Sequence, residues 1–129
     1  MNKCKLKYHI ILVTKYRKKI LDEKIMSFII DVIKEKMKSH KCNIITIRGD
    51  NMDHIHIMIE LMPSQSVSSI VKLIKQYTTY YSWKMFPTIL RKAYWYKNVI
   101  WSNGYFCCST GDASSETIER YINSQGDWL

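Results

Sequence analysis

The sequence predicts an α+β domain of the ferredoxin-like (RRM-like) class, with the order β-α-β-β-α-β, an antiparallel sheet and both main helices on one face. Two observations support this prediction. Apolar residues strictly alternate with other residues over 53–61, as in a half-buried strand. They recur at three- and four-residue steps after Asp22 and again after Ser66, as in amphipathic helices. With 129 residues in this order, we expect one domain over 1–129.

The first half of the chain supplies three of the predicted strands. Residues 5–14 are rich in β-branched and aliphatic side chains, which predicts a central strand, and the cationic run 15–19 predicts a loop that contacts phosphates. An amphipathic helix follows, with Asp22 as its N-cap. Residues 42–48 predict the second strand, which a short turn joins to the strand over 53–61. These last two strands therefore form a hairpin.

The second half of the chain is predicted to add a helix and a strand. Ser64 or Ser66 can cap the second main helix. The stretch 83–103 is rich in aromatic residues and cations, and we expect a long excursion with a short helical piece, because Pro87 discourages one continuous helix. Residues 104–110 then predict the fourth strand.

The composition indicates a nucleic-acid partner. Twenty Lys and Arg against eleven Asp and Glu give a formal charge of +9, which suits phosphate contacts, although a merely solvated basic surface is the alternative. Aromatic residues among the cations favour base stacking as well. The four cysteines contain no C-x-x-C pair, which predicts reduced thiols and a cytoplasmic protein. The apolar run 10–13 is too short for a signal sequence or a membrane span, so no membrane association is expected.

The strand over 53–61 carries the first candidate site. Its aliphatic row must meet the helices, so the row that contains His54 and His56 is expected on the open face of the sheet. Two imidazoles on a rigid strand need little reorganisation to bind one divalent ion. The motif alone leaves open a second interpretation, in which both are hydrogen-bonded surface histidines.

The last segment supplies a second candidate. Residues 116–125 predict a short final helix, on which Tyr121 and Gln125 are four residues apart and so lie on one face. A tyrosine on such a helix can also be structural, with its hydroxyl at the surface.

These motifs together resemble the single-tyrosine HUH transposases of small insertion sequences, which move as single-stranded DNA. Four blocks match in order over nearly the whole chain: 13–17 (VTKYR), 53–56 (DHIH), 101–106 (WSNGYF) and 118–125 (IERYINSQ). The chain departs from many relatives at two places. In the second helix it has Ile74-Lys75-Gln76 where those relatives carry Lys-Gly, and it has Cys107-Cys108 where they carry aliphatic or small residues. DNA contacts at those positions are therefore not carried over.

The resemblance implies a metal-dependent single-strand DNA endonuclease and strand transferase. His54, His56 and Gln125 would hold Mg²⁺ or Mn²⁺, and Tyr121 would be the nucleophile that forms a 5′-phosphotyrosine. It also implies recognition of hairpins at element ends. Relatives of this kind are homodimers with composite active sites, in which the tyrosine helix of one subunit reaches the histidines of the other.

Five cations have the best prospects as DNA contacts, because the predicted topology places them around the histidines: Lys15, Arg17, Arg48, Lys72 and Lys75. A non-catalytic single-strand nucleic-acid binder of RRM-like fold is the main alternative. Such sheets stack bases on exposed aromatic residues, whereas this strand presents His54, His56 and Met58. A relaxase-type HUH protein is a second alternative, although those are usually larger and tend to have a third histidine.

Overall fold

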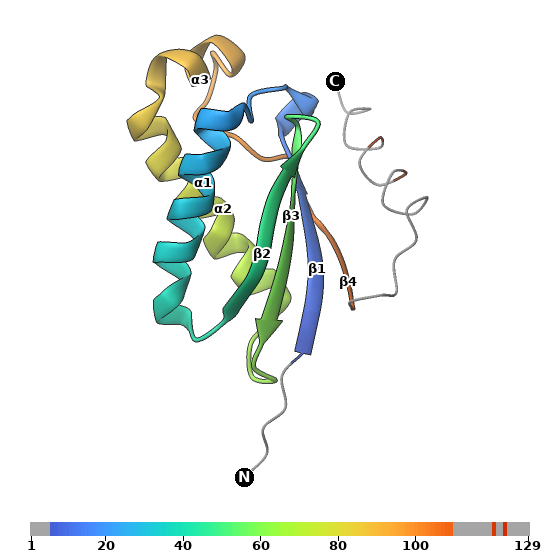
Figure 1. Cartoon of the computed structure of the whole chain (residues 1–129). Coiled ribbons are helices and arrows are strands. Elements are labelled where there is room, and N and C mark those ends of the chain that lie inside the picture. Colours follow the sequence, from blue (N-terminus) through green and yellow to red (C-terminus); the bar gives the residue numbers. More distant parts are fainter. Residues whose placement is uncertain (1–5, 110–119, 121–122, 124–129) are drawn as a thin grey trace.

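The computed structural model describes residues 6–109, 120 and 123, and within them it has the predicted ferredoxin-like architecture (Figure 1). The strands pair antiparallel in the order β2-β3-β1-β4, and α1 and α2 cover one face of the sheet. The elements are β1 (Leu6–Val13), η1 (Lys15–Arg17), α1 (Glu23–Met37), η2 (Lys38–His40), β2 (Asn43–Asp50), β3 (His54–Leu61), α2 (Val67–Met85), α3 (Pro87–Ala93) and β4 (Phe106–Ser109).

The predicted capping residues set where the helices begin. The Asp22 carboxylate accepts a hydrogen bond from the Ile25 N–H at 2.9 Å, and Ser66 caps α2. α2 extends further than its predicted apolar face and ends before Pro87, which takes the first position of α3. The short helical piece expected within 83–103 is therefore α3. No helix in the described ranges is long and apolar enough to cross a lipid bilayer.

The core lies between the sheet and the two long helices, as the alternation in β3 predicts. Ile55, Ile57 and Ile59 are fully buried there. The other face is less open than expected, because Ile11 and Val13 of β1 are also buried and Phe106 of β4 packs against them. The sequence predicted an open face around the histidines, and the structure corrects this prediction: that face carries its own apolar cluster.

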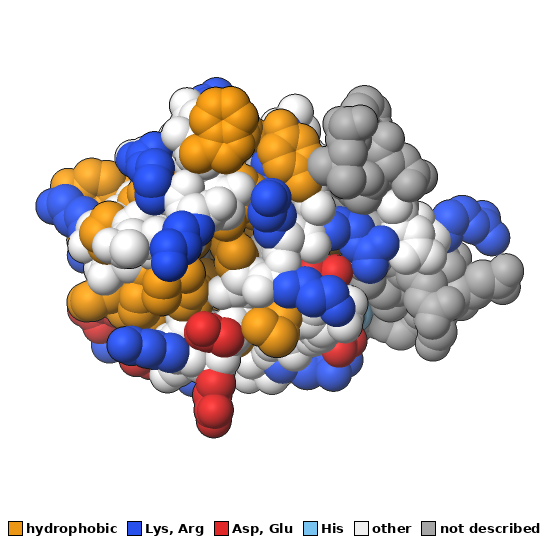
Figure 2. Space-filling view, turned by 90° about the horizontal axis from the view of Figure 1, so that it is seen from above, with side chains coloured by type: hydrophobic (Ala, Val, Ile, Leu, Met, Phe, Trp, Pro, Cys, Tyr) orange, Lys and Arg blue, Asp and Glu red, His pale blue; other side chains and the backbone are white. Residues whose placement is uncertain are grey.

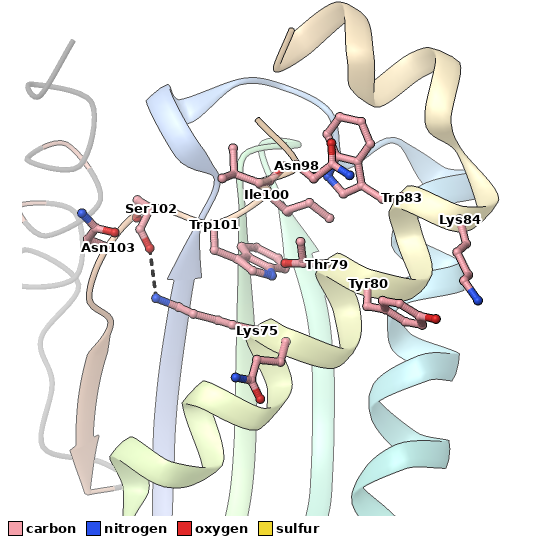
Figure 3. Close-up of a pocket in the computed structure, with 12 residues that line it drawn as sticks. Lys75, Thr79, Tyr80, Trp83, Lys84, Asn98, Ile100, Trp101, Ser102 and Asn103 are labelled. Carbon is pink, nitrogen blue, oxygen red and sulfur yellow. Dashed lines mark hydrogen bonds between the residues drawn. The ribbon is translucent and has the colours of Figure 1, made fainter. Parts of the chain in front are cut away.

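The aromatic excursion returns the chain to the sheet. Trp101 forms a β-bridge with Thr14, and its indole N–H donates to the Thr78 hydroxyl at 2.8 Å. The Trp83 indole N–H donates to the Val99 carbonyl at 3.0 Å. An open pocket of about 620 Å³ lies between α2 and residues 98–103, with Trp83, Trp101 and Tyr80 in its wall (Figure 3). This excursion ties α2 to the segment after β1.

The end of the molecule that carries α3 and η1 is rich in cations. Figure 2 views the molecule from this end and shows lysine and arginine side chains among hydrophobic ones. The segments 14–21 and 84–103 contain no Asp or Glu. This end therefore presents a positive surface next to the tip of the β2–β3 hairpin (Figure 1).

Candidate active site

The β2–β3 hairpin brings a carboxylate to the two histidines. Asp50 pairs with His54 and Arg48 pairs with His56 across the hairpin, so these four side chains share one face of the sheet. The tip is tight, because Asn51 adopts a left-handed backbone with φ of 53°. Asp50 is therefore the last residue of β2 and lies directly beside the first histidine.

The three side chains converge on one point. His54 Nε2 lies 3.4 Å and His56 Nε2 lies 3.8 Å from the same carboxylate oxygen of Asp50. The three ligand atoms lie within 4.8 Å of one another. Both imidazoles are buried, and in the described part of the chain His56 Nε2 has no hydrogen-bond partner. Since a buried polar atom needs a partner, this donor set fits a divalent cation.

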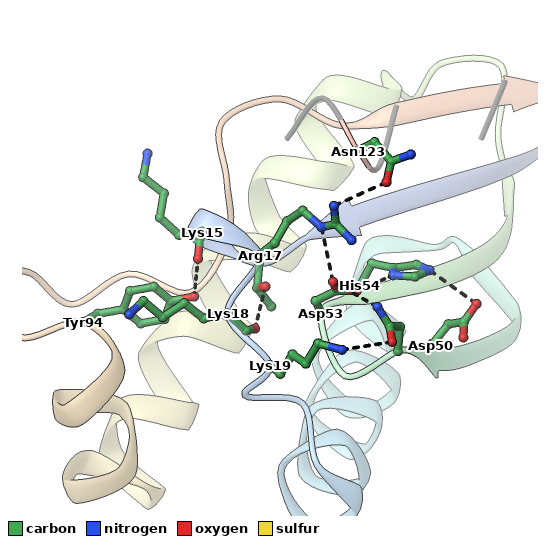
Figure 4. Close-up of polar contacts among 11 residues, drawn as sticks. Lys15, Arg17, Lys18, Lys19, Asp50, Asp53, His54, Tyr94 and Asn123 are labelled. Atoms are coloured by element: carbon green, nitrogen blue, oxygen red, sulfur yellow. Dashed lines mark hydrogen bonds and ion pairs between the residues drawn. The ribbon is translucent and has the colours of Figure 1, made fainter. Parts of the chain in front are cut away.

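A buried carboxylate orients the first imidazole. His54 Nδ1 lies 2.7 Å from Asp53 Oδ1, which favours the tautomer that donates there and leaves the Nε2 lone pair available to a metal ion. The other Asp53 oxygen accepts from Arg17 Nε and from the Asn51 amide, each at 3.3 Å (Figure 4). Asp53 is 1% exposed, and these contacts compensate its burial.

A third histidine orients the second imidazole. His9 Nε2 lies 2.9 Å from His56 Nδ1, with ring centroids 5.1 Å apart. The sequence pattern alone assigns no role to His9. The alternation of β1 places it on the same face as Ile11, but only the pairing of β1 with β3 shows that this face is also that of His56. Because His9 occupies Nδ1, Nε2 of His56 is the nitrogen that faces Asp50.

The surroundings keep His56 neutral. Burial is the largest cause that lowers the pKa of His56, to about 4, and the positive charges of His54, Arg48 and His9 add to it while Asp50 opposes it. Burial also lowers the pKa of His9. At neutral pH the His56 ring therefore keeps the lone pair that metal binding requires.

The last segment of the chain approaches this site at one described position. Arg17, which pairs with Asp53, also donates to the Asn123 side-chain oxygen at 3.3 Å (Figure 4). Arg120 and Asn123 have helical backbone, as the predicted final helix requires. Tyr121 and Gln125 lie outside the described residues, so their roles and the placement of the tyrosine in its own or a partner's site stay predictions.

The comparisons with known proteins identify the family of the chain. The family model described as "Transposase IS200 like" matches residues 2–125. The chain belongs to the IS200-like transposases. This confirms the family that the four sequence blocks indicated, and it makes the protein a DNA transposase.

Individual proteins resemble this chain in sequence or in fold. The transposase is 25% identical over 122 residues to the ISDra2 transposase TnpA of Deinococcus radiodurans, covering 95% of this chain and 85% of that protein. The crystal structure of a putative transposase from the same organism superposes with a TM-score of 0.85 at 22% identity, covering 96% and 93% of the two chains. A REP-associated tyrosine transposase bound to a REP hairpin superposes with a TM-score of 0.57 at 14% identity, covering 95% and 66%. These structures share the fold.

The five predicted DNA-contacting cations of the transposase fall into two groups. Arg48 lies beside His56 and Arg17 pairs with Asp53, so these two border the site, whereas Lys15 shares η1 with Arg17 and its ammonium lies over the Tyr16 ring. Lys72 and Lys75 lie on α2, which covers the opposite face of the sheet from the histidines. Their assignment as DNA contacts stays a prediction that no observation supports.

Lys75 already has two partners. Its ammonium donates to the carbonyl of Ser102 at 2.9 Å (Figure 3) and to that of Gly104 at 2.7 Å. Burial, with a smaller contribution from the charge of Lys15, lowers the pKa of Lys75. These contacts give Lys75 a structural role, since they hold α2 to the segment before β4.

The depressed pKa of His56 predicts a pH-dependent stability. In the unfolded transposase the ring takes up a proton near the ordinary pKa of 6.5, whereas in the folded protein it resists protonation until about pH 4. The unfolded state therefore binds more protons in this window, and stability is lost as the pH falls. Without metal, we expect His56 to lower the free energy of unfolding by about 1–2 kcal/mol between about pH 7.5 and about pH 5.

Urea unfolding in the presence of a chelator measures this effect. The wild type and His56→Gln are compared at both pH values, so that the difference between their pH dependences isolates His56. Equal pH dependences in the two proteins would contradict the assignment.

Proposed function

We propose that this transposase cleaves and rejoins single-stranded DNA at the ends of its insertion sequence through a 5′-phosphotyrosine intermediate on Tyr121. The observation that supports this most directly is the convergence of His54 Nε2, His56 Nε2 and the Asp50 carboxylate, with the remaining nitrogen of each ring held by Asp53 or His9. Such a set suits a cation that acts on a phosphate, and the positive surface around it suits DNA.

The residues proposed to hold Mg²⁺ or Mn²⁺ are His54, His56 and Asp50, with Gln125 as the further ligand that the family resemblance implies. When bound, the ion withdraws charge from the scissile phosphate and orients it for in-line attack. Asp50 adds an oxygen ligand and a negative charge to a site that the sequence analysis gave only neutral protein ligands. Oxygen ligands favour Mg²⁺ and Mn²⁺, whereas imidazole favours later transition ions.

Tyr121 supplies the nucleophile in this proposal. Its phenol oxygen attacks the phosphorus and the bond to the 3′ oxygen of the preceding nucleotide breaks. The phenol proton passes to solvent, and the leaving oxygen takes a proton from solvent to become a free 3′ hydroxyl. The new ester conserves the energy of the broken bond. A second 3′ hydroxyl can therefore displace the tyrosine and join the DNA to another end without ATP.

Hairpin recognition and dimerisation belong to the same proposal. The REP-associated relative binds a hairpin, and this chain shares its fold, so we propose hairpins at the element ends as the ligand. Two copies are proposed to form a homodimer with composite active sites. Within one chain Asn123 accepts a hydrogen bond from Arg17, a contact that is compatible with a tyrosine placed in its own subunit's site or in a partner's.

The test of this function is a search for a covalent product. The protein is incubated with Mn²⁺ and labelled single-stranded oligonucleotides that cover the DNA on both sides of its gene, and the mixture is separated under denaturing conditions. We expect a protein-linked DNA band that a chelator removes. Binding that a chelator leaves unchanged, with no linked product, would instead support the non-catalytic RRM-like binder.

The cations of η1 give a separate prediction. Lys15→Gln should weaken binding to single-stranded DNA and reduce the slope of log affinity against log salt by about 0.7, the value expected for one lost phosphate contact. Arg17→Gln should reduce the affinity and the salt slope in the same way. It should also lower the free energy of unfolding, because Arg17 forms an ion pair with the buried Asp53. Fluorescence anisotropy at several salt concentrations measures the affinity and the salt slope of each variant, and urea unfolding measures the stability of Arg17→Gln. Lys38→Gln, on the exposed surface after α1, is the matched control, and an unchanged slope in Lys15→Gln would exclude that contact.

A further inference from the structure

The segment after α3 leaves two large aromatic side chains in solvent. Tyr94 is fully buried, and its hydroxyl donates to the Lys15 carbonyl at 2.8 Å. The next residue, Trp95, is 76% exposed, and Tyr96 is 44% exposed. Burying the Trp95 side chain would stabilise the protein, but the backbone that the buried Tyr94 anchors holds it in water instead. An exposed apolar surface of this kind is typical of a binding site.

These rings continue into η1 as one row. The ring centroids of Trp95 and Tyr96 are 5.6 Å apart, and those of Tyr96 and Tyr16 are 6.2 Å apart. The Tyr96 hydroxyl donates to the Tyr16 hydroxyl at 2.8 Å. The Lys15 ammonium lies 5.5 Å from the centre of the Tyr16 ring. We call Trp95, Tyr96 and Tyr16 the aromatic row.

Backbone strain holds the inner end of this row. Tyr16 and Arg17 both adopt left-handed backbone, with φ of 59° and 52°, which costs free energy for residues other than glycine. The buried Thr14 fixes the turn, because its hydroxyl donates to the Lys18 carbonyl at 2.8 Å. The turn directs Tyr16 toward Tyr96 and Arg17 toward Asp53, so the row ends beside the residues that orient His54.

The surroundings of the row are cationic. Lys92 and Lys97 are exposed on either side of Trp95 in the sequence, and Lys15 and Lys18 flank Tyr16. No acidic residue occurs in either of the two segments that build the row. Flat rings among lysines match the chemistry of unpaired nucleic-acid bases, whose faces stack while their phosphates meet the cations.

We propose that the aromatic row is a stacking platform for unpaired bases of the single-stranded DNA that leads to the metal site. This inference rests on the proposed function for the identity of the DNA, but the row can be tested without cleavage. It assigns a role to the stretch 94–96, to which the sequence analysis gave none.

Equilibrium binding to an unstructured oligothymidine of about twenty nucleotides is the test, with a paired duplex of the same length as the second probe. We expect Trp95→Ala to weaken binding to the oligothymidine by about 5- to 100-fold and to leave duplex binding and the salt slope unchanged. Trp95→Phe, which retains a flat ring, should restore most of the affinity. Tyr80→Ala removes a 55% exposed aromatic side chain from α2 and is the matched control.

Tryptophan fluorescence gives an independent readout. Stacking on Trp95 should quench the emission of the wild type on adding oligothymidine, and this quenching should be lost in Trp95→Phe. Because the side chain is mostly exposed, Trp95→Ala should keep the thermal midpoint of the wild type.

Several outcomes would overturn the platform. The first is an unchanged affinity of Trp95→Ala for oligothymidine, and the second is an equal loss of that affinity in Tyr80→Ala. The third is a Trp95→Ala variant that loses binding to anionic vesicles but keeps its DNA binding, which would assign the row to a membrane surface. If Trp95→Ala weakens binding but the wild type forms no covalent product, the platform stands and the proposed function fails. If the product forms and Trp95→Ala binds normally, the platform alone fails.

Discussion

Tyr121→Phe should abolish the covalent protein–DNA product and lower strand cleavage by about a thousandfold or more, because phenylalanine lacks the oxygen that forms the ester. The substitution removes one atom, so metal affinity and single-strand binding should stay near their wild-type values. Denaturing electrophoresis of the labelled DNA measures cleavage and linkage together, and a metal titration and an anisotropy titration check the two bound states.

Tyr80→Phe is the control for this substitution, since it removes a hydroxyl from an exposed position on α2. A linked product that persists in Tyr121→Phe, or that mass spectrometry maps to another tyrosine such as Tyr16, would move the nucleophile elsewhere. Mixing Tyr121→Phe with His54→Ala also tests the homodimer. Activity recovered only in the mixture would show that the tyrosine of one subunit serves the histidines of the other.

His56→Ala should weaken Mn²⁺ binding by about a hundredfold or more and abolish cleavage, because it removes a ligand and also leaves the facing nitrogen of His9 without its partner. Asp50→Asn should weaken Mn²⁺ binding by about tenfold, since it retains an oxygen but removes the charge. Mn²⁺ titrations followed by electron paramagnetic resonance measure the affinity directly and do not depend on turnover.

The chain offers a charge-matched control for Asp50→Asn. Glu60→Gln lies at the far end of β3 and removes one negative charge from the same face of the sheet, but its carboxylate contacts Asn43 and not the histidines. We expect it to bind Mn²⁺ like the wild type. Wild-type affinity in Asp50→Asn would limit the protein ligands to the two histidines and the predicted Gln125.

Within the described residues, the sequence alone determined the main strands and helices and the face on which the histidines of β3 lie. The two-residue period of β3 places His54 and His56 on one side and the aliphatic row on the other, and the three- and four-residue spacing defines α1 and α2. These patterns are local, because the backbone of a strand or helix fixes the direction of each side chain. The family blocks added the metal-binding and nucleophile assignments through resemblance, and the family itself is confirmed.

Only the tertiary structure decided what surrounds the two imidazoles. His9 and Arg17 are distant from both histidines in the sequence, whereas Asp50 is close to His54, and all three meet the histidines through the register of β1 and β2 on β3 and through the strained turn of η1. A shift of one residue in either register would turn His9 or Asp50 to the other face of the sheet. The tight turn sets the register of β2 on β3, but the pairing of β1 with β3 joins segments far apart in the sequence and depends on how the strands pack in the sheet, so only the tertiary structure brings His9 to His56.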